Sequence, residues 1–342
     1  MNQPILFKGS PGSPYTRKML ALLRYRRLPY RLLLGGHDQH FGLPLPKVAL
    51  LPTFYLPNEQ GDIEALVDST PLIRRLERDY PDQRTVIPED PVLEFFDALF
   101  EDYGDEWLTK AMFHYRWYYQ ADIHNAGSIL PRWSALTAPE SAIEKRREMF
   151  TRRQIDRLYV VGSNDVTAPV IEASYRRFLD ALETHLHRFP FLMGGRPGSA
   201  DFAAYGQLTQ LAHFDPTPRA LTLEVAPRVF AWVDVMDDLS GLEVDDASWL
   251  SRDELGDALR PLLEELGRAY IPVMLANARA LNDGASQVET TVGGQPWVQQ
   301  VFPYQGRCVA ELRGRYARLD DADRDAVNAL IRGTGVDALF TP

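Results

Sequence analysis

The sequence predicts a small α/β domain followed by a larger all-helical domain, and a C-terminal segment that carries a β-hairpin. Up to about residue 80, short apolar runs alternate with helical periodicity in the order β-α-β-loop-β-β-α. From Glu94 onward the strand patterns disappear and apolar residues recur at helical spacing. Near the C-terminus, two strand-like runs flank Gly293-Gly294, a pair typical of a tight hairpin turn.

The composition narrows the class of protein. The chain has 342 residues, of which 45% are apolar and 25% charged, enough for more than one folded domain. A net charge of -10 without a basic run argues against a nucleic-acid partner. One cysteine, Cys308, and seven scattered histidines predict neither a disulfide framework nor a metal site. Because no signal segment or membrane-length apolar run is present, we expect a cytoplasmic protein without a membrane partner.

The first helix has a well-defined start. A short strand at residues 5–7 runs through a Gly/Pro turn into Ser13-Pro14, where Ser13 has the form of an N-cap and Pro14 that of the first helical residue. The Ser13 hydroxyl would then lie beside unpaired backbone N–H groups at the positive end of a helix dipole, a place that stabilises an anion such as a thiolate. An ordinary structural cap explains the same pair of residues.

The next elements complete the α/β domain. Strands are predicted at residues 30–34, 48–56 and 65–67, with a loop over residues 37–47. The last strand leads into Asp68-Ser69-Thr70-Pro71, where Ser69 or Thr70 would cap a helix that begins at Pro71. Three prolines in residues 81–91 indicate a linker. We therefore expect units at residues 1–82, 92–245 and 246–342.

The second and third units are predicted to be mainly helical. The aromatic stretch at residues 113–119 indicates packing between helices or across an interface, or the wall of an apolar ligand site. Gly198 is the expected N-cap of a helix in which Asp201 accepts from the Gly198 N–H. In the tail, Pro261 and Pro272 should break or kink a helix over residues 254–280. The hairpin at residues 287–301 needs apolar cover, so the tail should pack on the rest of the protein.

Taken together, these features resemble the glutathione transferase superfamily, in which a thioredoxin-like domain precedes an all-helical domain. The resemblance covers about residues 4–240 and is carried by three motifs. Residues 13–18 are similar to the family's first strand-helix junction. Leu51-Pro52 looks like the element that carries its cis-proline, and Asp68-Ser69 looks like its acidic-Ser pair.

The resemblance implies glutathione as co-substrate and gives these residues roles. Ser13 would donate to the glutathione thiolate, with Ser10 as the alternative. The Leu51 backbone, exposed beside a cis Pro52, would pair with the peptide part of glutathione. Asp68 would accept from the γ-glutamyl ammonium, and Ser69 would bind its carboxylate. Because Ser13 cannot form a mixed disulfide, conjugation to a small hydrophobic electrophile, or reduction of a peroxide, is the expected chemistry.

The second substrate is less well defined by the sequence. The candidates for the electrophile pocket are Tyr15, His40, Tyr115 and Trp117. The resemblance further implies a homodimer with a role in detoxification and no metal. Residues 100–170 and the tail beyond residue 240 exceed a usual transferase, which leaves one alternative open: a non-catalytic binding or assembly module of the same fold.

Overall fold

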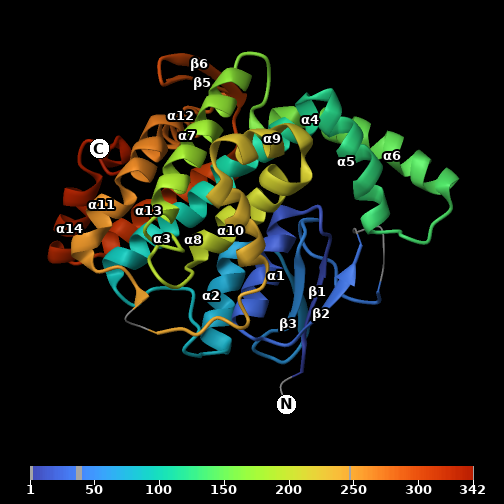
Figure 1. Ribbon diagram of the computed structural model, residues 1–342, viewed down its shortest axis with the longest axis horizontal. Helices are drawn as coiled ribbons and strands as arrows, with labels where there is room; N and C mark the ends of the chain where they lie inside the picture. The colour runs from blue at the N-terminus through green and yellow to red at the C-terminus, as the bar shows by residue number, and fades with distance from the viewer. Residues whose placement is uncertain (1–2, 36–40, 246–247, 342) are drawn as a thin grey trace.

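The computed structural model describes residues 3–35, 41–245 and 248–341 (Figure 1). It confirms the predicted fold class, with a thioredoxin-like sheet domain first, a large helical part after it, and a hairpin in the C-terminal segment. The elements of the first domain are β1 (Ile5–Gly9), α1 (Pro14–Tyr25), β2 (Tyr30–Leu34), β3 (Thr53–Pro57), β4 (Ile63–Leu66) and α2 (Ser69–Asp79).

The four-stranded sheet has the order β2-β1-β3-β4. β1 is parallel to β2 and antiparallel to β3, and β4 is antiparallel to β3. On the central strands, the buried rings of Phe7 and Phe54 stack with centroids 4.7 Å apart. Helix α1 packs against α8 (Ser199–Leu208) of the helical part, where a Cβ at Gly206 would lie 2.5 Å from the Pro14 carbonyl oxygen. Only glycine allows this close approach, which places the start of α1 at the boundary between the domains.

The strand predicted at residues 48–56 begins only at Thr53. The last β1–β3 pair joins Lys8 to Thr53, and beyond it β1 runs into the turn before α1. Pro52 also has no N–H to donate to a partner strand. Residues 48–51 are therefore irregular, and the side chains of Val48 and Leu50 are exposed.

The helical part is built around α8, all of whose residues are buried. The predicted bond at its start is confirmed, since the Gly198 N–H donates to Asp201 Oδ2 (2.9 Å). Helices α5 (Gln120–Trp133) and α6 (Glu140–Ile155) form a projecting hairpin (Figure 1). The elements are α3 (Pro91–Tyr103), η1 (Gly104–Leu108), α4 (Thr109–Tyr118), α5 (Gln120–Trp133), α6 (Glu140–Ile155), η2 (Leu158–Val161), α7 (Ala168–Leu186), α8 (Ser199–Leu208), η3 (Thr209–Phe214), α9 (Pro216–Val225) and α10 (Pro227–Asp237).

The C-terminal segment contains the predicted hairpin. Its turn residues Gly293 and Gly294 have φ values of 56° and 81°, which glycine adopts without strain. Pro261 lies inside a helix, whereas Pro272 follows a π-helical turn. The elements are α11 (Arg252–Glu265), η5 (Leu266–Tyr270), α12 (Ile271–Asn282), β5 (Gln287–Val292), β6 (Gln295–Gln300), α13 (Pro303–Arg318), α14 (Asp321–Ile331) and η6 (Val336–Leu339).

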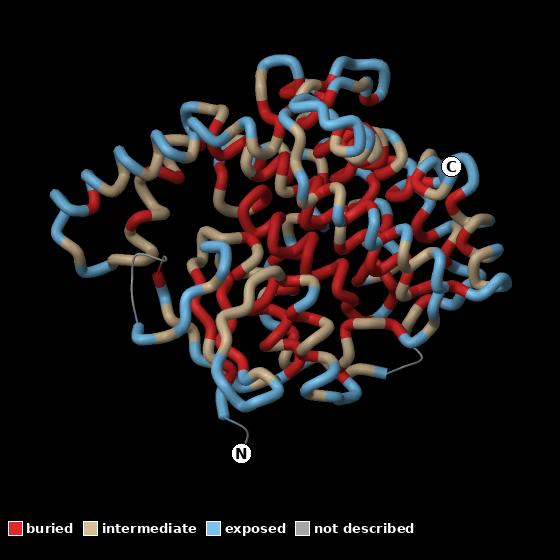
Figure 2. The backbone as a smooth tube through the Cα atoms, turned by 180° about the vertical axis from the view of Figure 1, so that it is seen from behind, coloured by how far each residue is buried: buried red, intermediate tan, exposed pale blue. Residues whose placement is uncertain are grey.

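One cluster of buried apolar side chains runs through all three parts of the chain. In Figure 2, the residues coloured as buried gather in the middle of the molecule. The ring of Phe95 in α3 packs on Tyr316 and Phe340 of the C-terminal segment, at centroid distances of 6.2 and 5.6 Å. The hairpin is covered as well, because Trp297 is completely buried. Among the described residues, no helix combines the length and apolar character that crossing a membrane requires.

Candidate functional site

The start of α1 and the loop before β3 meet at Ser13. Its side-chain oxygen accepts from the Thr16 backbone N–H (3.2 Å), so Ser13 is the predicted N-cap. Its hydroxyl donates to the Leu51 carbonyl oxygen (3.2 Å), and the Leu51–Pro52 peptide bond is cis, as the sequence predicted. Ser13 and Leu51 are half-buried, while Pro52 is buried. Two of the predicted site elements therefore lie in direct contact.

Ser10 shapes the turn that precedes Ser13. Its carbonyl oxygen accepts from the Ser13 N–H (2.9 Å), and its own N–H donates to Thr16 Oγ1 (3.3 Å). These bonds use the Ser10 backbone, so its position is explained by turn structure. It lies close enough in the chain to remain the alternative to Ser13.

Arg116 anchors this turn to the helical part and was not predicted as a site residue. It is buried in α4, and its Nη1 donates to the Gly12 carbonyl oxygen (3.1 Å). Its Nε and Nη2 donate to the Asp215 carboxylate at 2.9–3.0 Å, and Nη2 also donates to Gln210 Oε1 (2.6 Å). A planar guanidinium can serve these partners at once, which fixes the Gly12 carbonyl relative to α4. The one sign of this role in the sequence was that Arg116 is a charged residue inside the aromatic stretch at residues 113–119.

The start of α2 differs from the prediction. The helix begins at Ser69 rather than Pro71, and Asp68 occupies the N-cap position. Asp68 has a φ of 79°, unusual for a residue with a side chain, and its carboxylate makes no capping hydrogen bond to its own helix. Instead, Asp68 Oδ2 accepts from the hydroxyl of Tyr304 in α13 (2.6 Å). The carboxylate thus points toward the C-terminal segment.

Ser69 belongs to a buried network centred on Lys18. The Lys18 ammonium donates to Ser69 Oγ (3.1 Å), Glu101 Oε1 (2.8 Å) and Asp105 Oδ2 (2.6 Å). The side chain of Lys18 is only 1% exposed. Burial by itself would lower the pKa of Lys18, but the two carboxylates outweigh it and raise that pKa. The Ser69 hydroxyl therefore faces the interior, leaving the backbone at the helix start as the group that could meet a ligand.

Several carboxyl groups around this network are buried, and there are fewer cations beside them than would be needed to pair with each carboxylate. Burial raises the pKa of Asp97 and Asp102 to about 7 and that of Glu106 and Asp201 to about 8. Nearby carboxylates add to the effect at each of them. Glu101 shows the reverse: burial opposes its ionisation, but Lys18 and Arg74 lower its pKa to about 2. Near neutral pH, these carboxyls should therefore bind protons more tightly in the folded protein than in the unfolded chain.

We expect the free energy of unfolding to fall as pH rises from about 5 to 8. The unfolded carboxyls titrate near pH 4, so the folded state binds more protons in this window. The stabilisation is complete below pH 4 and is lost as pH passes through the folded pKa values of about 7 to 8. Each such group contributes a slope of about 1.4 kcal/mol per pH unit. Urea unfolding at pH 5.5 and 8 measures this.

The matched variant for this test is Glu106→Gln, which keeps the size of the side chain and removes its ionisation. It should flatten the pH dependence and raise stability at pH 8. Equal unfolding free energies of the wild-type protein at pH 5.5 and 8 would show that these carboxyls do not hold protons.

Among the expected electrophile-pocket residues that the structure describes, Tyr115 and Trp117 are buried, and Tyr15 is half-buried. Tyr15 donates through its hydroxyl to the Asp105 carbonyl oxygen (2.8 Å). Tyr115 is 3% exposed and packs on Tyr119 and Tyr175. Trp117 is 1% exposed and packs on Phe113 and Phe150. Tyr115 and Trp117 therefore offer no ring surface to a substrate, and His40 lies outside the described residues.

A different apolar wall lies beside the start of α1. A Cβ at Gly12 would come within 2.5 Å of Leu130 Cδ2 and 3.2 Å of the Trp133 ring, so the end of α5 touches this turn. Leu130 and Trp133 are half-buried, and the Trp133 ring packs on Phe214 with centroids 4.8 Å apart. No periodicity in the sequence indicated that α5 reaches the Ser13 turn.

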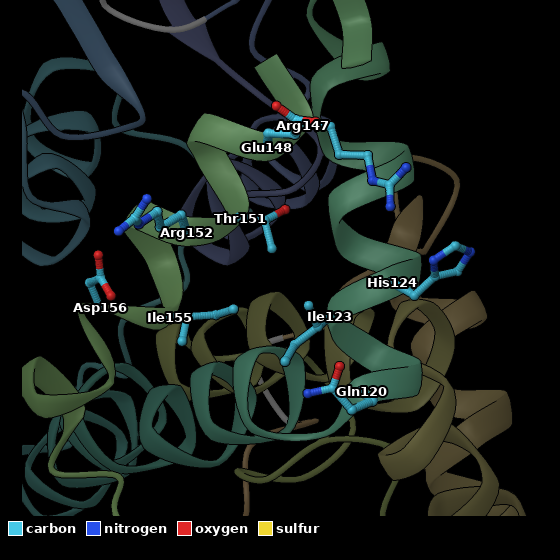
Figure 3. Close-up of a pocket in the computed structure, with 9 residues that line it drawn as sticks. All are labelled: Gln120, Ile123, His124, Arg147, Glu148, Thr151, Arg152, Ile155 and Asp156. Carbon is cyan, nitrogen blue, oxygen red and sulfur yellow. The ribbon is translucent and has the colours of Figure 1, made fainter. Parts of the chain in front are cut away.

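A hollow of about 450 Å³ lies between α5 and α6 (Figure 3). Ile123 and Ile155 point into the space between the two helices, and charged side chains, among them Arg147 and Arg152, surround it. It shares no residue with the set around Ser13, Leu51 and Asp68, so we do not assign it to the same chemistry. In the part of the chain that the structure describes, no cluster of three or more His, Cys, Asp or Glu could hold a metal ion.

Two family models match this chain. The model described as "Glutathione S-transferase, N-terminal domain" matches residues 7–84, and "Glutathione S-transferase, C-terminal domain" matches residues 148–234. The first match covers the sheet domain from β1 through α2, and the second covers α7 to α10 in the helical part. A search of curated proteins found no match.

Solved structures were also found to be similar. A GST-like protein from Pseudomonas syringae is 18% identical, with 69% of this chain and 67% of that chain covered and a TM-score of 0.38. A glutathione S-transferase from Rhodospirillum rubrum is 16% identical, with 73% and 98% covered and a TM-score of 0.42. A glutathione S-transferase from Methylobacterium radiotolerans, in complex with glutathione sulfonate, is 18% identical, with 69% and 91% covered and a TM-score of 0.40.

The two family matches follow the order of the family's domains, and they coincide with a thioredoxin-like sheet domain and an all-helical part. This chain therefore carries both domain types of the glutathione S-transferase family, at residues 7–84 and 148–234.

Proposed function

We propose that this chain is a glutathione-dependent transferase in which Ser13 stabilises the glutathione thiolate for attack on a small hydrophobic electrophile or a peroxide. The observation that carries the proposal is the contact between Ser13 Oγ and the Leu51 carbonyl oxygen (3.2 Å). It brings the start of α1 next to the backbone that would pair with the peptide part of glutathione.

The position of Ser13 suits a thiolate. Pro14 has no N–H, and the N–H groups of Thr16 and Arg17 are bonded to Ser13, so the helix dipole of α1 is what favours negative charge there. Ser13 Oγ accepts from the Thr16 N–H through a lone pair, so this bond does not use the hydroxyl proton, which remains available for donation. Rotation of that proton from the Leu51 carbonyl to a sulfur atom would give the thiolate a charge-assisted hydrogen bond, which lowers the pKa of the thiol.

The remainder of glutathione would extend from Leu51 toward α2. Asp68 is half-buried, and its carboxylate can receive the γ-glutamyl ammonium. The backbone N–H groups at the start of α2 would bind the neighbouring carboxylate, because the Ser69 hydroxyl is already bonded to Lys18. Leu130 and Trp133, rather than Tyr115 and Trp117, are the side chains that we propose for the electrophile wall.

Asp68→Asn is expected to weaken glutathione binding by about tenfold to a hundredfold. The variant keeps the shape of the side chain but removes one charge-assisted contact, which is worth about 1.5–3 kcal/mol. Asparagine also tolerates the positive φ at this position. Isothermal titration of glutathione into wild-type protein and variant measures the two dissociation constants.

Glu59→Gln is the control for that titration, because it makes the same acid-to-amide change at an exposed position of the sheet domain. It should leave the dissociation constant unchanged. Equal affinities of wild-type protein and Asp68→Asn would remove Asp68 from the site. Glutathione binding without turnover of a generic aryl halide would instead favour the non-catalytic module.

A further inference from the structure

The C-terminal segment reaches the proposed glutathione site at Tyr304, whose hydroxyl donates to Asp68. We propose that Tyr304 is a positioning residue of this site, which holds the Asp68 carboxylate in the orientation that receives the γ-glutamyl ammonium. This inference rests on the proposed function and adds to it a residue from the segment beyond the part that resembles the family.

The contact between Tyr304 and Asp68 is short and directional. The phenol donates to Asp68 Oδ2 over 2.6 Å, a distance typical of a hydroxyl bonded to an ionised carboxylate. Both residues are half-buried, so the bond is partly shielded from water. Burial, with the charge of Asp68 added, raises the pKa of Tyr304, so that the phenol stays a donor at every physiological pH.

Tyr304 is itself held in place by its surroundings. It follows Pro303 in the first turn of α13, and Phe302 is the residue before that helix. The buried amide of Asn277 in α12 binds both backbone groups of Phe302: its Oδ1 accepts from the Phe302 N–H (2.8 Å), and its Nδ2 donates to the Phe302 carbonyl oxygen (2.9 Å). The Arg307 guanidinium covers the Tyr304 ring at 4.9 Å. These contacts fix the start of α13 and the Tyr304 ring, and so they fix the position from which the phenol donates to Asp68.

The backbone of Asp68 indicates what Tyr304 prevents. An aspartate at an N-cap normally accepts from backbone N–H groups in the first turn of its own helix. Asp68 makes no such bond and holds a φ of 79°. With its carboxylate turned to Tyr304, the N–H groups at the start of α2 are left for the carboxylate of a ligand.

Tyr304 and the ammonium need not compete for Asp68. An ionised carboxylate offers about four acceptor positions on two oxygens. Tyr304 uses one position on Oδ2, which leaves Oδ1 for the ammonium. Without the phenol, the carboxylate is free to turn back and cap α2, where it would withdraw from the ammonium and cover the N–H groups.

The test is a double-mutant cycle on the full-length protein, with glutathione as the titrant in calorimetry. Tyr304→Phe keeps the ring and its contact with Arg307, and it should raise the dissociation constant about fivefold to tenfold. Because Tyr304 acts through Asp68, Tyr304→Phe combined with Asp68→Asn should bind no more weakly than Asp68→Asn alone. In steady-state kinetics, KM for glutathione should rise by more than kcat falls.

Tyr316→Phe is the matched control. Tyr316 lies on the same helix, is half-buried and donates to Asn328 Oδ1 (2.8 Å), so its loss reports the effect of removing any phenol from α13. It should leave the dissociation constant unchanged.

Four results would overturn the proposal. Unchanged affinity of Tyr304→Phe, or strictly additive effects in the cycle, would show that Tyr304 does not act through Asp68. Tighter binding by Tyr304→Phe would mean that the phenol competes with the ammonium. If wild-type protein does not bind glutathione, the proposed function fails and this inference with it, whereas failure of the cycle alone leaves the proposed function intact.

Discussion

Replacing Lys18 by methionine is expected to lower the free energy of unfolding by about 3–5 kcal/mol, the usual cost of removing one partner from a buried ion pair. Lys18 Nζ lies 2.8 Å from Glu101 Oε1 and 2.6 Å from Asp105 Oδ2, and none of these atoms is in bulk water. Methionine fills a similar volume, so the loss would come from Asp105 left without its cation and Glu101 left with Arg74 alone. Urea unfolding at pH 8 measures it.

The pH dependence of this loss identifies its cause. Without Lys18, both carboxyls would hold their protons more tightly, since burial already raises the pKa of Asp105 to about 6. Protonation removes the unpaired charge, so the destabilisation should be smaller at pH 5 than at pH 8. A loss independent of pH would point to packing instead.

Two further variants test whether the lost charge or the changed volume of the side chain causes the destabilisation. Lys145→Met makes the same change at an exposed position of a helix and should alter stability by less than about 0.5 kcal/mol. Lys18→Met combined with Asp105→Asn removes one of the unpaired charges and should recover part of the loss. If Lys18→Met costs less than about 1 kcal/mol, the buried ion pairs do not hold the helices together.

The local structures that the sequence predicted correctly depend on neighbours within a few positions. Ser13 caps α1 because its oxygen reaches the Thr16 N–H three residues later, and Asp201 reaches back to Gly198 over the same separation. Gly293-Gly294 fixes a two-residue turn for reasons that concern only its own backbone. Such contacts can be recognised from residue type and spacing, whatever the rest of the chain does.

The parts that the sequence could not predict depend on pairs that are far apart in the chain. Asp68 was expected to lie beside a capped helix start, but its carboxylate bonds to Tyr304, 236 residues later. Arg116 donates to Asp215, which lies 99 residues later in the chain. These pairs depend on how helices pack, which residue type and periodicity do not specify.

The burial of individual side chains was also difficult to predict from the sequence. Lysines are almost never fully buried without a partner, so Lys18 in the motif at residues 13–18 gave no indication of an interior role. The aromatic stretch at residues 113–119 allowed either core packing or a ligand wall, and packing accounts for Tyr115 and Trp117. In both cases the burial of the side chain, which follows from tertiary structure, decided its role.

Ser13→Ala is expected to lower the rate of glutathione conjugation by about tenfold to a hundredfold while changing glutathione affinity much less. The Ser13 hydroxyl would bond to the sulfur most strongly when the sulfur is ionised, whereas affinity would rest on contacts to the rest of the tripeptide. One charge-assisted hydrogen bond is worth about 1.5–3 kcal/mol, which gives this range of rates. Steady-state kinetics and calorimetric titration measure the two effects.

The same variant should shift the pH–rate profile. If Ser13 lowers the pKa of bound glutathione, its loss should move the apparent pKa toward about 8.5, the value of a free cysteine thiol. At neutral pH the variant would then carry less thiolate, and raising the pH should restore part of the rate. A slower rate with an unchanged profile would assign Ser13 a role other than thiolate stabilisation.

Ser13 also caps α1, and this second role must be separated from the first. Loss of the cap in Ser13→Ala should cost about 1 kcal/mol of stability, whereas glycine at an N-cap costs only a few tenths. Ser13→Gly should therefore lose as much activity as Ser13→Ala while it stays nearly as stable as wild-type protein. Ser10→Ala completes the set, because a larger loss from it than from Ser13→Ala would place the thiolate at Ser10, and full activity of all three variants would show that neither serine stabilises the thiolate.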